Sequence, residues 1–135
     1  MNTKKFLLAV LAGFVGNSVA YAILEELLLK GYMAKEVYEP AGASVGGAPL
    51  MAFVAVLSMS LIMAYIYPKG YQGGKPLYEG SRFGILLGLF AGIPFGIFFG
   101  LMFSIGSVPA LVLILVYALE VAVAGLLIGL VYGRA

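Results

Sequence analysis

A single carboxylate stands in the middle of the last hydrophobic segment of this chain. Glu120 lies about halfway along residues 108–132, between Leu119 and Val121. A charged side chain that faces lipid at this depth is costly, so this one must be buried, neutralised or hydrated. Intramembrane carboxylates of this kind bind protons or cations in transport proteins. We therefore expect Glu120 to carry the chemistry of this protein.

Other polar groups are predicted at the same depth. Tyr117 precedes Glu120 by three residues, shares its side of the helix and could donate a hydrogen bond to it. Asn17 and Ser18 fall in the middle of the first hydrophobic segment, Ser58 and Ser60 near the middle of the second, and Pro94 near the middle of the third. Four helices thus place polar groups at one level. Transporters build substrate and ion sites from such groups near the membrane midplane. The alternative is that these groups bond to one another and hold the helices in register.

Two further glutamates lie near the end of the first hydrophobic segment. Glu25 follows Tyr21 by four residues, on the same helical face, and could form the mouth of a path toward the interior. The alternative is a solvated helix end at which Glu26 pairs with Lys30, four residues later. The spacing is consistent with both interpretations.

Missing residue types limit the chemistry further. The sequence contains no Cys, His or Asp, which excludes thiol redox catalysis, disulfides, haem ligation by histidine, and thiolate or imidazole metal sites. Residues 68–76 resemble a phosphate-binding loop only in Gly73-Gly74-Lys75, because its first Gly and its Ser or Thr are absent. We expect no enzyme activity, no cofactor and no metal. The net charge of +2 is too small to indicate a nucleic-acid partner.

The composition predicts the elements that position these residues. Hydrophobic residues make up 63% of the chain, charged residues 10%, and the mean hydropathy is +1.09, far outside the range of soluble proteins. Four hydrophobic segments approach or exceed the roughly 20 residues that span a bilayer: residues 6–29, 48–67, 83–105 and 108–132. The predicted fold class is all-α, an integral membrane four-helix bundle, as a single domain over residues 1–135.

Basic residues beside the segment ends predict the orientation. One side has two, Lys30 and Lys35, and the other has six: Lys4, Lys5, Lys69, Lys75, Arg82 and Arg134. The positive-inside rule then places both termini in the cytoplasm. We expect the chain in the lipid bilayer of a bacterial or archaeal cytoplasmic membrane. Similar endings of the two halves, at residues 67–70 and 132–135, suggest a duplicated two-helix hairpin.

Glycines recur at every fourth residue of the third hydrophobic segment: Gly84, Gly88, Gly92, Gly96 and Gly100. Helix association in lipid depends on the close backbone approach that small residues permit. A spacing of four advances by about 400°, so the stripe drifts about 40° per step and we expect more than one helix to cover it. Gly125 and Gly129 in the fourth segment offer one partner surface. Pro94 is predicted to introduce a kink or hinge among these glycines, and static packing is the alternative.

Two functional hypotheses follow from these features. The first is a small transporter or channel-like subunit in which Glu120 binds a proton or cation, assisted by Asn17 and Tyr117. The second is a non-catalytic scaffold or accessory subunit whose glycine surfaces dock other helices. Both predict a homo-oligomer or a larger membrane complex. In length and helix number the chain resembles the small multidrug resistance transporters, but those carry their membrane glutamate in the first helix, so we assign no family.

Overall fold

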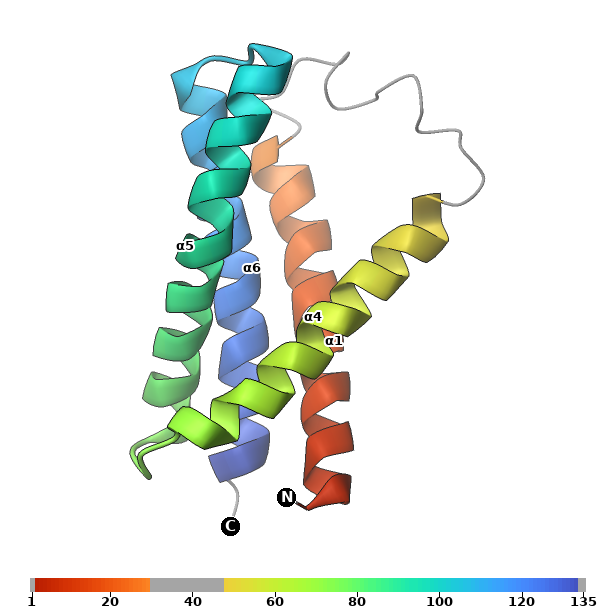
Figure 1. Cartoon of the computed structure of the whole chain (residues 1–135), viewed down its shortest axis with the longest axis vertical. Coiled ribbons are helices and arrows are strands. Elements are labelled where there is room, and N and C mark those ends of the chain that lie inside the picture. The colour runs from red at the N-terminus through yellow and green to blue at the C-terminus, as the bar shows by residue number, and fades with distance from the viewer. Residues whose placement is uncertain (1, 30–47, 134–135) are drawn as a thin grey trace.

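The computed structural model describes residues 2–29 and 48–133, and these residues form long helices (Figure 1). Helix α1 (Thr3–Leu24) continues into a short π-helix, η1 (Glu25–Leu29). It is followed by α4 (Ala48–Gly70), α5 (Pro76–Phe103) and α6 (Ser107–Gly133). Four helices are long and apolar enough to cross a membrane. The prediction of an all-α four-helix membrane bundle is confirmed.

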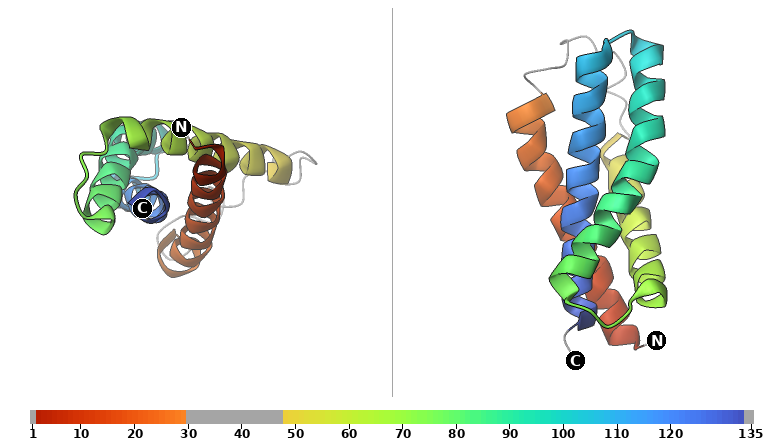
Figure 2. Two further views of the ribbon diagram at one scale, coloured as in Figure 1. Left: turned by 90° about the horizontal axis from the view of Figure 1, so that it is seen from below. Right: turned by 90° about the vertical axis from the view of Figure 1, so that its left-hand side faces the viewer.

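Helix α6 is the centre of the bundle. It contacts α5, α1 and α4, and Figure 2 shows it between α1 and α5. Helix α4 crosses α1 obliquely, and its Ala48 end leaves the bundle (Figure 1). Helices α5 and α6 instead stay in contact from Gly80 to Gly100 of α5, so the two hairpins pack differently and their duplication stays a prediction. The two ends of the described chain lie at the same end of the bundle (Figure 1). Which side of the membrane that is also stays a prediction, and Lys30, Lys35 and Arg134 lie outside the described residues.

The connection between the second and third spanning helices is shorter than predicted. Helix α4 continues to Gly70 and α5 already begins at Pro76, whereas the hydrophobic segments ended at 67 and began at 83. Proline suits the first position of a helix, where its missing N–H group is not needed. The Glu79 carboxylate accepts the backbone N–H of Gly74 at 2.8 Å and of Gln72 at 3.2 Å. These bonds hold residues 71–75 against the first turns of α5.

The other helix ends also follow local chemistry. The Asn2 side chain accepts hydrogen bonds from the backbone N–H groups of Lys4 at 3.0 Å and Lys5 at 3.4 Å, so α1 begins before the hydrophobic run does. Helix α5 ends at Phe103, because Ser104 adopts a left-handed conformation with φ of 51°. Gly106, with φ of 85°, completes the turn into α6.

Helix α4 passes through a proline near its end. Pro68 has no N–H group to donate to the carbonyl of Ala64, one turn earlier. The hydroxyl of Tyr132, near the end of α6, donates to that carbonyl at 2.8 Å. The Tyr132 ring also stacks on Tyr67, with ring centroids 5.8 Å apart. One end of α6 therefore completes the hydrogen bonding of α4.

The glycine stripe of α5 packs against one helix rather than several. A methyl group added at Gly80 would lie 2.6 Å from the carbonyl oxygen of Gly125, and one at Gly88 would lie 2.7 Å from Cα of Ala118. Even at Gly100, the nearest side chain is that of Ala110 on α6, at 3.2 Å. We expected more than one helix to cover the stripe because a straight neighbouring helix could not follow its drift. Helices with a repeat longer than 3.6 residues wind around each other instead, and Figure 2 shows α5 crossing α6 obliquely.

Candidate functional site

Glu120 lies on the side of α6 that faces α1. A methyl group at Gly16 of α1 would meet Leu127 at 2.6 Å and Ala124 at 3.6 Å. Glu120 is one turn before Ala124 on the same side of α6, since four residues advance by about 400°. Its side chain is only 6% exposed. The carboxylate is therefore buried near the end of α1 that joins η1.

Among the described residues, the charged group that acts on Glu120 is another carboxylate. Glu25, the first residue of η1, interacts electrostatically with Glu120. Tyr21, one turn earlier in α1, lies within electrostatic range of both glutamates. In the described part of the chain neither a hydrogen bond nor a basic side chain compensates the charge of Glu120. Two like charges thus share a largely apolar region.

Both interpretations of Glu25 stay predictions. Glu25 is half-buried and within electrostatic range of Glu120, whereas its neighbour Glu26 is exposed. The proposed partner of Glu26, Lys30, lies outside the described residues. The spacing of residues in the sequence did not predict that Glu25 and Glu120 interact electrostatically. The usable signal was the row of small residues on α1, at positions 13, 16 and 20, which predicts the face that meets α6.

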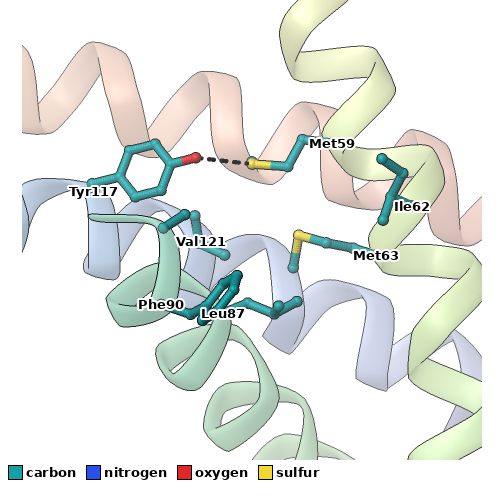
Figure 3. Close-up of a pocket in the computed structure, with 8 residues that line it drawn as sticks. Met59, Ile62, Met63, Leu87, Phe90, Tyr117 and Val121 are labelled. Carbon is teal, nitrogen blue, oxygen red and sulfur yellow. Dashed lines mark hydrogen bonds between the residues drawn. The ribbon is translucent and has the colours of Figure 1, made fainter. Parts of the chain in front are cut away.

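Tyr117 uses its hydroxyl group differently from the prediction. It donates to Sδ of Met59 on α4 at 3.5 Å (Figure 3), although it remains within electrostatic range of Glu120. A thioether is a weak acceptor. Tyr117 also lines an apolar pocket of about 130 Å³ between α4, α5 and α6, together with Met59, Met63, Leu87, Phe90 and Val121. Its hydroxyl therefore points into the pocket and not to the carboxylate.

Asn17 is buried, at 4% exposure, on the same face of α1 as Gly13 and Gly16. Its Oδ1 atom has no hydrogen-bond partner in the described part of the structure. A buried amide oxygen without a partner carries a desolvation cost, so it marks a place where a donor would be favourable. Ser18, the next residue, is half-buried.

Two other predicted members of the midplane set lie outside the bundle interior. Ser58 is exposed, whereas Ser60 is fully buried and donates to the carbonyl of Val56 at 2.9 Å. Pro94 is exposed on α5. The reason is helical phase: Pro94 lies two residues from Gly92, which faces α6, and two residues rotate by about 200°. The predicted ring of polar groups from four helices is therefore not assembled.

Sequence reasoning missed the buried hydroxyl of Tyr67. This residue is 3% exposed, and its hydroxyl has no hydrogen-bond partner among the described residues. Its ring packs edge-on against Phe83 at 5.3 Å and stacks on Tyr132. A tyrosine near the end of a hydrophobic segment is also typical of the membrane interface, and periodicity alone does not distinguish an interfacial ring from a buried one.

The donor types at the site bear on what it could bind. The described residues contain no group of three or more His, Cys, Asp or Glu side chains that could hold a metal ion. The groups near Glu120 are a second carboxylate and phenol hydroxyls. Comparison of the chain with protein-family models, curated proteins and solved structures finds no match.

Proposed function

We propose that this protein is a small ion-coupled transporter or channel-like subunit in which the Glu120 carboxylate binds a proton or cation. The observation that carries the proposal is the burial of Glu120, at 6% exposure, within electrostatic range of another carboxylate. Ionisable groups inside membrane proteins are rare, pair with one another or with backbone carbonyls, and mark substrate, ion or proton pathways. Within the described residues Glu120 has no partner of opposite charge, which supports an ionic ligand.

The electrostatics of the site favour a bound positive charge. A buried carboxylate loses its hydration, and the negative charge of Glu25 adds repulsion. A proton or cation on Glu120 removes both costs, and its release restores them. The free energy of the site therefore changes with its occupancy, as ion coupling requires.

The position of Glu120 offers a way to couple its occupancy to helix packing. It lies in the contact between α6 and α1, while Gly125 on another side of α6 packs against α5. Glu120 and Gly125 are about 140° apart around the helix axis. A negative charge at Glu120 weakens the α1 contact and leaves the α5 contact in place. We infer that α1 moves against a fixed α5–α6 pair when the site empties.

Proton flux in liposomes tests this proposal. The purified protein is reconstituted with a pH-sensitive dye inside the vesicles, and a potassium gradient with valinomycin sets the membrane potential. We expect flux in the wild-type protein, loss of flux in Glu120→Gln, and unchanged flux in Glu26→Gln, whose side chain is exposed. Size-exclusion chromatography establishes that each variant is folded. Undiminished flux in Glu120→Gln, or none in wild type, would refute the proposal.

A second candidate function is that of a non-catalytic subunit, and the Ala48 end of α4 favours it. Leu50, Met51 and Phe53 are 67%, 74% and 50% exposed, where α4 leaves the bundle (Figure 1). Either lipid or another helix covers this surface in a membrane. Because the chain has no cysteine, the single cysteine of Met51→Cys can show whether lipid or another copy of α4 covers this surface. Disulfide-linked dimers in oxidised membranes would favour assembly through α4, and monomers alone, as expected for Phe90→Cys on α5, would favour lipid.

A further inference from the structure

The apolar pocket between α4, α5 and α6 lies close to the middle of all three helices. Met59 and Met63 line it from α4, Leu87 and Phe90 from α5, and Val121 from α6 (Figure 3). The bounds of these helices place each of the five residues within about one turn of the helix centre. In a spanning bundle this depth is the centre of the hydrocarbon core. The molecules available to the pocket there are the ends of lipid acyl chains.

The pocket leads from the outer surface of the bundle into its core. Ile62 and Phe90 are exposed to the surroundings of the bundle, whereas Met63 and Val121 are only 2% exposed. Helix α4 makes its main contacts with α1 and α6, and few with α5. The pocket therefore occupies a place where two neighbouring helices are not packed directly against each other.

The lining of the pocket suits hydrocarbon rather than water or an ion. Its one hydroxyl group is that of Tyr117, which already donates to Sδ of Met59. Apolar cavities of about 150 Å³ stay dry and bind ligands such as benzene, and this pocket has a volume of about 130 Å³. Methionine side chains are flexible and adapt to ligands of irregular shape. A short length of hydrocarbon chain matches both the volume and the lining.

We propose that this pocket binds the end of a lipid acyl chain, which inserts between α4 and the α5–α6 pair and reaches Met63 and Val121. An empty pocket would lose the dispersion contacts of its lining, and a bound chain restores them. The chain contacts side chains of all three helices, so it joins α4 to α5 where direct contacts are few. This site is separate from Glu120, which faces α1, and it does not depend on the proposed function.

Photoreactive lipids test the proposal in reconstituted membranes. One phosphatidylcholine carries a diazirine at the end of an acyl chain and a second carries it next to the ester, and peptide mass spectrometry locates the adducts after illumination. We expect the first lipid to label Met63 about tenfold more than the second does, because only its diazirine reaches the centre of the hydrocarbon core. Ile128 is fully buried outside the pocket and should stay unlabelled, and the exposed Leu115 provides the reference for lipid around the bundle.

A variant that fills the pocket provides the second arm of the test. Ala91 lines the pocket, and the ring of Ala91→Phe is about the size of the benzene that such cavities hold, so labelling of Met63 relative to Leu115 should fall by about tenfold. The control Ala22→Phe, at an exposed position of α1, should label as the wild-type protein does. Size-exclusion chromatography establishes that both variants are folded, and the comparison of the two lipids in the wild-type protein needs no variant.

Two results would overturn the proposal. The first is labelling of Met63 in the wild-type protein that is no stronger than labelling of Ile128. The second is an unlabelled Met63 together with wild-type dimers that are lost in Ala91→Phe, which would assign the pocket to a side chain of a second copy.

Discussion

The hydroxyl of Tyr132 should stabilise the protein because it bonds a carbonyl that Pro68 leaves unpaired. Pro68 cannot donate to the carbonyl of Ala64, and the Tyr132 hydroxyl donates to it at 2.8 Å. Ala64 is fully buried, so water cannot take the place of the hydroxyl. Tyr132→Phe keeps the ring that stacks on Tyr67 and removes only the donor.

The structure sets the magnitude and the sign of the change in the free energy of unfolding. A buried carbonyl left without a partner costs about 1–3 kcal/mol, so Tyr132→Phe should lower the free energy of unfolding by that amount. Tyr67→Phe is the matched control in the same aromatic cluster. Its buried hydroxyl has no hydrogen-bond partner among the described residues, and removing it should leave stability unchanged or raise it.

A double-mutant cycle identifies the cause of the loss. Pro68→Ala restores an N–H group that can bond the carbonyl of Ala64 within α4. Tyr132→Phe should therefore cost less in the Pro68→Ala background, with an interaction energy of about 1–2 kcal/mol. Pulse proteolysis across a titration from mild detergent into SDS measures the unfolding free energies. Equal costs of Tyr132→Phe in both backgrounds would show that the carbonyl of Ala64 does not depend on this hydroxyl.

Three further predictions follow from the packing and the connection between α4 and α5. Gly88→Ala should destabilise the bundle by about 2 kcal/mol or more, since its methyl group would lie 2.7 Å from Cα of Ala118. Gly92→Ala should cost less in the same proteolysis assay, because the nearest atom, 3.2 Å away, belongs to a side chain. Asn17→Leu should keep or raise stability, since it removes a buried oxygen without a partner; a large loss would reveal an unseen bond. Glu79→Ala should speed proteolytic cleavage within residues 71–75, and an unchanged rate would contradict its role in holding them.

Spanning helices were predictable because length and hydropathy determine them. The four segments, their number and the all-α class all follow from the run lengths of apolar residues. Helix ends were less predictable, because capping groups lie outside the hydrophobic runs. Asn2 extends α1 by accepting N–H bonds, and Pro76 with Glu79 begins α5 before its apolar residues.

Individual candidate residues of the site could be predicted from the sequence, but the way they are arranged in space could not. Glu120 and Asn17 were chosen as candidates from their depth in the hydrophobic segments, and both are buried. Depth along a helix does not give direction, however, so Ser58 and Pro94 were placed with them although both face outward. The proximity of Glu25 to Glu120 depends on the register of α1 against α6, which a single sequence does not contain.

The residue types of α6 account for the central position of this helix. Its glycines, such as Gly125, allow α5 to approach backbone to backbone. Ala124 admits α1 on a second side, and Val121 packs toward α4 on a third. Glu120 occupies the α1 side one turn before Ala124. A charge at the end of a contact between two helices can part them locally and leave the rest of the bundle packed, which is how a carboxylate could be both buried and exchangeable.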